Sequence, residues 1–207
     1  MIAVIDYGCG NLTSLAESLR RLKVRFRVTA DPSEIGSSDG VILPGVGHFG
    51  HAVDMIERLE LRPIILDSVA KGVPLLGICL GMQLLADWSE EAGEGAKGLG
   101  LIPGIVRNIG GLGVSSLIPH VGWNELRFVN PSHPMAMEVA EGRDVYFVHS
   151  YAVVLADQIH LVGVTHHDVE LVAAIAKDHV WGVQFHPEKS SSVGHRVLKN
   201  FVDSLSC

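Results

Sequence analysis

The chain has 207 residues and a formal net charge of −7, and 47% of its residues are hydrophobic against 19% that are charged. This length and composition exclude a disordered chain and are typical of one α/β domain, which we expect to span residues 1–207. The negative charge argues against nucleic acid or an anionic membrane as the main partner.

The first half of the chain alternates between strand and helix patterns. Short apolar runs predict strands at Ile2–Ile5, Val24–Thr29, Val41–Leu43 and Pro74–Cys79. Apolar residues at helical spacing predict helices at Leu12–Leu22, His51–Leu59, Ile64–Lys71 and Leu80–Trp88, and Asp31-Pro32-Ser33 predicts a break after the second strand. This alternation indicates a parallel sheet with helices on both faces.

The second half contains short strand patterns with few helices between them. The predicted strands are Ile105–Ile109, Leu126–Val129, Val145–Val148, Leu161–Val164, Leu171–Ile175 and Val180–Gln184, and a last helix covers Val193–Leu205. Strands without helical crossovers pair antiparallel. We therefore expect an α/β fold with a mixed, mainly parallel central sheet flanked by helices, and with antiparallel additions.

The three cysteines, Cys9, Cys79 and Cys207, are widely spaced, and the chain contains no CxxC motif. An odd number without a paired pattern argues against a disulfide framework and favours a reducing compartment. The first residues lack the basic region of a signal peptide, and the apolar stretch Val73–Ala86 is too short to span a bilayer. We expect a cytoplasmic protein that does not insert into a membrane.

The strongest chemical signal is the segment Gly-Ile-Cys-Leu-Gly at residues 77–81, which lies between an apolar strand and an apolar helix. A tight strand-to-helix turn needs glycine on both sides of a nucleophile, because side chains there would clash. The first N–H groups of the following helix would then stabilise a thiolate and an oxyanion. Alone, the segment is equally compatible with a buried structural Cys79.

A second signal is the segment Phe-His-Pro-Glu-Lys at residues 185–189. Pro187 disfavours a helical conformation at His186, and in an extended segment His186 and Glu188 point to the same side. The imidazole could move the thiol proton while the carboxylate orients it. A surface His-Pro turn is the better interpretation of this segment alone, but the pair with Cys79 favours a catalytic triad.

Together, residues 77–83 (Gly-Ile-Cys-Leu-Gly-Met-Gln) and 184–190 (Gln-Phe-His-Pro-Glu-Lys-Ser) resemble the class I, triad-type glutamine amidotransferases. Pro-Gly-Val-Gly at 44–47 falls where that family has its oxyanion strand. Three more segments, at residues 6–11, 119–124 and 146–151, resemble the glutaminase subunits of imidazole glycerol phosphate synthases. The resemblance covers the whole chain and implies the flavodoxin-like fold of the class.

The resemblance implies that Cys79 attacks the side-chain amide of glutamine, that His186 transfers the proton to departing ammonia, and that Glu188 orients His186. Water would then hydrolyse a glutamyl thioester. The implied oxyanion and substrate-binding residues are Gly45, Val46, Gly47, Leu80, Gln83, Ser150 and Tyr151.

The resemblance also implies a heterodimer with a (β/α)8-barrel cyclase subunit, where ammonia would enter imidazole glycerol phosphate and a purine precursor. The candidate interface residues are Asn11, His120, Trp123, Asn124, Tyr146 and Lys189. Val121, Ala152 and Ser191 depart from the residues usual in this subfamily, which affects the partner face rather than the triad.

No cofactor or metal is expected. Gly8-Cys9-Gly10 follows a strand but lacks the third glycine of a dinucleotide fingerprint. The eleven histidines include the neighbours His166 and His167, without cysteines or carboxylates at ligand spacing.

Two alternatives remain open on the sequence. The chain could serve another synthase, such as pyridoxal-phosphate or anthranilate synthase, since the triad fits them equally. It could also be a catalytically silent regulatory module that keeps the fold.

Overall fold

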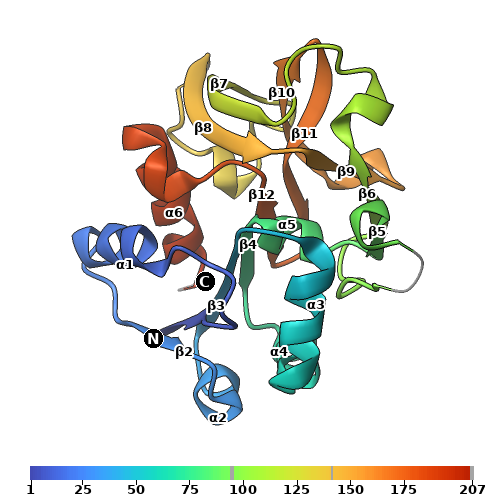
Figure 1. The fold of residues 1–207 in the computed structure, drawn as a ribbon. Coiled ribbons are helices and arrows are strands. Elements are labelled where there is room, and N and C mark those ends of the chain that lie inside the picture. The colour runs from blue at the N-terminus through green and yellow to red at the C-terminus, as the bar shows by residue number, and fades with distance from the viewer. Residues whose placement is uncertain (94–95, 141, 206–207) are drawn as a thin grey trace.

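A nine-stranded sheet runs through the protein, whose computed structural model describes residues 1–93, 96–140 and 142–205 (Figure 1). Its strands are β1 (Ile2–Ile5), β2 (Phe26–Thr29), β3 (Gly40–Gly45), β4 (Leu75–Cys79), β7 (His120–Phe128), β8 (Arg143–His149), β10 (Leu161–His167), β11 (Val169–Lys177) and β12 (Val180–Val183). Their order in space is β2-β1-β3-β4-β12-β11-β10-β7-β8. The strands from β2 to β12 pair in parallel, and those from β12 to β8 pair antiparallel. The mixed sheet with antiparallel additions is thus confirmed, although its antiparallel part is as extensive as its parallel part.

Helices cover both faces of the parallel part of the sheet. The α-helices are α1 (Leu12–Arg21), α2 (Pro32–Gly36), α3 (Phe49–Arg58), α4 (Leu61–Ala70), α5 (Leu80–Leu84) and α6 (Ser191–Ser204). In Figure 1, α1 and α6 lie on one side of the sheet and α3 and α4 on the other. The buried residues divide accordingly, since Ile2 and Val4 of β1 pack with α1 and α6, while Ala3 and Ile5 pack with α3 and α4. This alternation follows from the two-residue period of a strand and places a core on each face.

A small second sheet carries one wall of the site described below. It consists of β5 (Trp88–Ser89), β6 (Gly104–Asn108) and β9 (Tyr151–Leu155). The structure also contains short 3₁₀ turns, which are η1 (Glu90–Ala92), η2 (Ile109–Leu112), η3 (Pro134–Ala136), η4 (Gln158–His160) and η5 (Pro187–Lys189). Because β9 directly follows β8, the connection at Ser150 is where the chain passes from the large sheet to the small one.

The helix predicted at Leu80–Trp88 is wrong in length, because α5 ends at Leu84. The carbonyl groups that would continue it instead accept hydrogen bonds from residues 99–102. The pairs are Leu99 N–H to Leu84 O at 2.7 Å, Leu101 N–H to Leu85 O at 2.9 Å and Gly100 N–H to Ala86 O at 3.1 Å. A loop that takes the last carbonyl groups of a helix stops its propagation.

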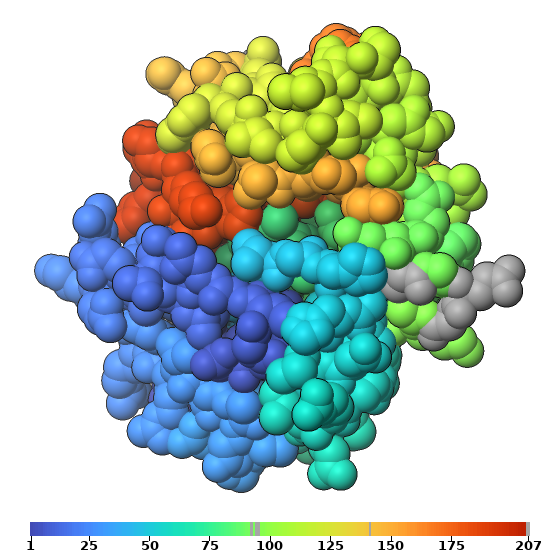
Figure 2. Space-filling view, viewed as in Figure 1, coloured from blue at the N-terminus to red at the C-terminus, as the bar shows by residue number. Residues whose placement is uncertain are grey.

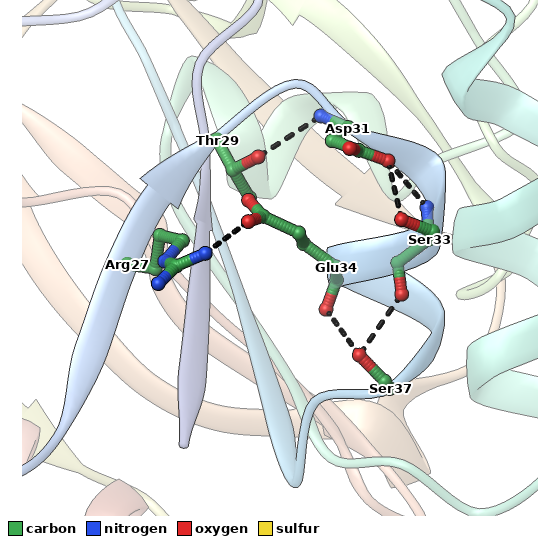
Figure 3. A network of polar contacts seen from close by, with 6 residues as sticks. All are labelled: Arg27, Thr29, Asp31, Ser33, Glu34 and Ser37. Atoms are coloured by element: carbon green, nitrogen blue, oxygen red, sulfur yellow. Dashed lines mark hydrogen bonds and ion pairs between the residues drawn. The ribbon is translucent and has the colours of Figure 1, made fainter.

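The break predicted at residues 31–33 is confirmed, and it also starts a helix. The Asp31 carboxylate caps α2 by accepting the Ser33 N–H at 2.8 Å and the Ser33 hydroxyl at 2.7 Å (Figure 3). Asp31 itself donates its N–H to the Thr29 hydroxyl at 3.0 Å, and Arg27 of β2 pairs with Glu34 of α2. Pro32 fits the first helical position because its missing N–H would have no partner there.

Among the residues that the structure describes, no helix combines the length and apolar character needed to cross a membrane. Cys9 and Cys79 are buried free thiols, and Cys207 lies outside the described residues.

Candidate active site

Cys79 ends β4 and caps α5 in a strained backbone conformation. Its φ of 54° and ψ of −110° lie in a region that residues other than glycine rarely occupy. The thiol is nearly buried, with 5% of the residue exposed. Its Sγ accepts from Gln184 Nε2 at 3.7 Å and can donate to the Val148 carbonyl oxygen at 3.9 Å. Strain held by this much surrounding structure is typical of a functional residue.

The glycines on either side of Cys79 are required by close backbone contacts. A Cβ added at Gly81 would overlap the carbonyl oxygen of Leu43, and one added at Gly77 would lie 2.6 Å from the carbonyl oxygen of Gly81. The expectation that side chains would clash at both positions is confirmed. These contacts let α5 pack directly against the end of β3 and fix the direction of the Cys79 side chain.

His186 and Glu188 form a buried pair next to Cys79. The backbone of His186 is extended, with φ of −94° and ψ of 98°, and Pro187 begins the turn η5. His186 Nδ1 lies 2.8 Å from Glu188 Oε1, and the two side chains are 3% and 5% exposed. Since a carboxylate only accepts, Nδ1 carries the proton. His186 Nε2 and Glu188 Oε2 are buried without a hydrogen-bond partner among the described residues, so Nε2 is free for proton transfer.

The surroundings of His186 favour its protonated form. Burial lowers the pKa of the imidazole, but its interactions with the Cys79 thiol and the Glu188 carboxylate outweigh burial and raise it to about 9. A histidine that is protonated at neutral pH can pair with a thiolate and can supply a proton to a leaving group. The geometry and the charge of the pair therefore suit nucleophilic catalysis by Cys79.

A pocket of about 360 Å³ opens directly over Cys79. Figure 2 shows a hollow between the cyan segment after β3 and the orange segment around the β8–β9 junction, with green residues near α5 at its bottom. Six of the predicted substrate-site residues line the pocket: Val46, Gly47, Leu80, Gln83, Ser150 and Tyr151. Sequence reasoning did not include the other lining residues, namely Glu91, Pro119, Val148 and His149.

The backbone of the predicted oxyanion strand is turned in part away from this pocket. Gly45 pairs in register with Cys79, and Gly47 has a φ of 108°, which favours glycine. The N–H of Val46, however, donates to the carbonyl oxygen of Cys9 at 2.9 Å. In this conformation that amide is already bonded and is not available to an oxyanion over Cys79.

Gln184 is a residue of the site that sequence reasoning missed. It is fully buried, and its Nε2 contacts the Cys79 sulfur while its Oε1 accepts from Gln83 Nε2 at 3.0 Å. Gln83 Nε2 also donates to the Tyr151 carbonyl oxygen at 3.0 Å. The available signal was the two-residue spacing between Gln184 and His186, which places both side chains on the same side of an extended segment.

The candidate interface residues fall into two groups. Trp123 is 53% exposed, and its ring meets that of Tyr146 edge-on at 6.1 Å between centroids, while Lys189 Nζ lies 5.6 Å from the Tyr146 centroid. Asn11 is exposed at the start of α1, where its side chain makes no capping hydrogen bond. His120 differs from these residues, because it is 4% exposed and bonded to its neighbours. Asn124 is bonded to the His120 ring and to the His166 carbonyl oxygen.

In the described part of the chain, histidine, cysteine, aspartate and glutamate form no group of three or more that could hold a metal ion.

Comparison with known proteins assigns this site to a family. The family model described as "Glutamine amidotransferase class-I" matches residues 3–205. The chain belongs to the class I glutamine amidotransferases. A solved structure of a putative GMP synthase subunit from Thermoplasma acidophilum superposes with a TM-score of 0.74 at 21% identity, covering 99% of this chain and 93% of that one. The likeness supports the fold of the class.

This class I glutamine amidotransferase has close full-length relatives. A Geobacillus sp. protein named "Imidazole glycerol phosphate synthase subunit HisH" is 46% identical over 208 residues, covering 99% of this chain and 97% of that protein. A Bacillus cereus protein of the same name is 47% identical over 201 residues, covering 97% and 93%. Within its class, the amidotransferase therefore belongs to the HisH family.

Proposed function

We propose that this amidotransferase hydrolyses glutamine to glutamate and ammonia through a thioester at Cys79, and delivers the ammonia to a cyclase subunit in histidine biosynthesis. The observation that carries the proposal is the buried His186–Glu188 pair, joined at 2.8 Å, beside a strained cysteine at the floor of a pocket. Membership in the HisH family favours this function over service to another synthase.

Each triad member has a distinct role in the proposed reaction. The Cys79 thiolate attacks the side-chain amide carbon of glutamine, and the carbonyl oxygen becomes an oxyanion. As this intermediate collapses, His186 gives its proton to the nitrogen, and ammonia leaves. Neutral His186 then takes a proton from water, which attacks the thioester and releases glutamate. Glu188 keeps Nδ1 protonated so that Nε2 faces the sulfur in each step.

The pocket residues position glutamine and stabilise the developing charge. We assign oxyanion binding to backbone N–H groups at Leu80 and in the segment 45–47, and binding of the glutamine head group to Gln83, Ser150 and Tyr151. The volume of this pocket, about 360 Å³, lies at the lower end of the range found for small-ligand sites. No cofactor is needed, because every proton and electron pair of the hydrolysis is accounted for by the triad and water.

We further propose that the partner is a (β/α)8-barrel cyclase, in a cytoplasmic heterodimer with one amidotransferase domain over residues 1–207. The residues Leu117, Val121 and Trp123 are 84%, 55% and 53% exposed, respectively. These residues are close together in the sequence and flank Pro119, which lines the pocket. Exposed apolar side chains gathered beside an active site support an interface there. Asn11, Tyr146 and Lys189 are the polar and aromatic contacts that we propose for it.

Reconstitution with the cyclase subunit tests this function. Because the Val46 N–H is bonded to Cys9 O, the free amidotransferase lacks one oxyanion donor. We propose that docking of the cyclase turns this N–H toward the pocket, and one such donor contributes roughly 10²–10³-fold to turnover. We expect glutamate release to rise by roughly that factor when the cyclase and its nucleotide ligand are added. Glutamate would be measured by a coupled dehydrogenase assay.

Two results of this reconstitution would contradict the proposal. Absence of glutamate release from the complete mixture would refute the glutaminase function. Equal turnover with and without the partner would refute the proposed dependence on the Val46 amide. A pull-down with the anthranilate and pyridoxal-phosphate synthase subunits serves as the specificity control.

A further inference from the structure

We propose that His120 and His149 form a positioning pair, fixed in their Nδ1–H tautomers, that holds the carbonyl group of Tyr151 at the wall of the glutamine pocket. The inference rests on the proposed function for the identity of the ligand. It adds a role for two buried histidines that the triad mechanism does not use. Their hydrogen bonds link β7, which carries the exposed Trp123, to the end of β8.

The hydrogen bonds at the pocket end define the state of His149. His149 Nδ1 lies 2.9 Å from the Tyr151 carbonyl oxygen, which can only accept, so Nδ1 carries the proton. His149 Nε2 lies 3.0 Å from His120 Nδ1. In a neutral imidazole this Nε2 is an acceptor, so His120 must donate from Nδ1.

The hydrogen bonds of Asn124, at the other end of this series, independently assign the same tautomer to His120. The side-chain amide of Asn124 has a defined orientation, since its Oδ1 accepts the Glu125 N–H at 2.8 Å and its Nδ2 donates to the His166 carbonyl oxygen at 2.8 Å. The same Nδ2 lies 3.2 Å from His120 Nε2, which must therefore be an acceptor. The proton of neutral His120 is then on Nδ1, as the pocket end requires.

Stacking holds the His120 ring, and burial keeps both rings neutral. The His120 ring is stacked on Phe147 at 4.9 Å and on His167 at 4.1 Å between centroids. Burial, with smaller contributions from neighbouring histidines, lowers the pKa of His120 and of His149 to about 4. With both rings neutral and fixed in orientation, only one arrangement of donors and acceptors satisfies the hydrogen bonds from Asn124 to Tyr151.

The Tyr151 carbonyl group is the point where this pair meets the active site. It accepts from His149 and from Gln83 Nε2, at 2.9 Å and 3.0 Å. Gln83 also bonds Gln184, whose Nε2 contacts the Cys79 sulfur. His149 itself lines the pocket together with Ser150 and Tyr151. Without the hydrogen bond from His149, the Tyr151 carbonyl group would no longer be fixed at the pocket wall. The contact of Gln83 and Gln184 with the nucleophile would then be disturbed.

Nitrogen-15 NMR of the imidazole rings tests the tautomers on the unaltered chain, without any need for activity. We expect both His120 and His149 to show the pattern of a neutral Nδ1–H ring at neutral pH, with assignment from single-residue variants. An Nε2–H or a doubly protonated pattern at either residue overturns the proposal. Because this readout does not depend on glutamine, it separates failure of the pair from failure of the proposed function.

A matched pair of variants tests the positioning role in the complex with the cyclase. His120→Asn places an amide donor near the position of Nδ1 and is expected to keep the KM for glutamine near that of the unaltered protein. His120→Phe keeps an aromatic ring for stacking but leaves His149 Nε2 without its donor. We expect its KM to rise by about tenfold, with a smaller change in kcat, because a buried acceptor is left unpaired.

Unchanged KM in His120→Phe, or an equal loss in both variants, would overturn the positioning role. Should His120→Phe fail to fold, the tautomers of the unaltered chain still decide the proposal. If the tautomers are as expected but no variant or parent hydrolyses glutamine, the pair stands and the proposed function fails.

Discussion

Replacing Cys79 with alanine is expected to lower glutamine-dependent synthesis by the complex on the order of 10⁶-fold, while synthesis from added ammonia stays near its original rate. Removal of a triad nucleophile in other hydrolases has an effect of this size, because the remaining groups cannot form a covalent intermediate. Ammonia bypasses the step at Cys79 and reacts in the partner. Product formation from glutamine and from ammonium salt would be compared in the same preparation.

The matched control for this experiment is Cys9→Ala. Cys9 is also a buried free thiol, and its contact with the Val46 amide is made by its backbone carbonyl group, which the substitution keeps. We expect it to retain glutamine-dependent synthesis. Loss of both glutamine-dependent and ammonia-dependent synthesis in Cys79→Ala would mean that Cys79 has a structural role instead.

Glu188→Gln is expected to lower the kcat for glutamine hydrolysis by roughly 10²–10⁴-fold. The side-chain amide introduced at position 188 can donate to His186 Nδ1. It then favours the neutral tautomer that carries its proton on Nε2, in which Nε2 cannot accept a proton. The substitution also removes a negative charge that helps to raise the pKa of His186 to about 9. The pKa of His186 should therefore fall, and its protonated form should be lost at lower pH than in the unaltered protein.

The dependence of activity on pH shows whether the pKa of His186 falls in Glu188→Gln. His186 must be protonated to release ammonia, so activity should decline as pH rises through its pKa of about 9. In Glu188→Gln the decline should begin at lower pH. Glu17→Gln is the control, because Glu17 is 51% exposed and pairs with Arg20 and Arg21 on the surface of α1. A profile that does not move in Glu188→Gln would contradict the proposed pairing with His186.

The parallel half of the fold could be predicted because its signals are local. The apolar runs at Ile2–Ile5 and Pro74–Cys79 each form a strand, and helices lie between them as expected. The end of α5 could not be predicted, since Leu84 and Leu85 have good helical character and only the distant loop at residues 99–102 takes their carbonyl groups.

The antiparallel half was less visible in the sequence. The strand predicted at Leu126–Val129 extends over His120–Phe128, and β9 at Tyr151–Leu155 was not predicted. The burial of β7 alternates, with residues 121, 123, 125 and 127 exposed, but the polarity of the sequence does not follow it, because Val121 and Trp123 face outward while His120 and Asn124 face inward. Its pairing with β8 over seven residues, from His120 opposite His149 to Leu126 opposite Arg143, stabilises it instead. Such long-range pairing leaves little trace in local composition.

The candidate site shows the same division between chemistry and geometry. Residue type and spacing were sufficient to bring Cys79, His186 and Glu188 together as a candidate triad. The orientation of the Val46 amide could not be predicted, because no side chain encodes the direction of a backbone N–H. The His120–His149 contact likewise depends on the register of β7 and β8, which only the folded sheet defines.

Labelling with a glutamine-like electrophile tests the central claim most directly, in the complex with the cyclase subunit. Such a reagent binds the glutamine pocket and is captured by the residue that attacks the amide carbon. Intact mass and peptide mapping would then locate the adduct. We predict a single adduct on Cys79, which excess glutamine prevents and which Cys79→Ala lacks. An adduct on Cys9, Cys207 or any other residue, with Cys79 unmodified, would contradict the assignment of Cys79 as the nucleophile.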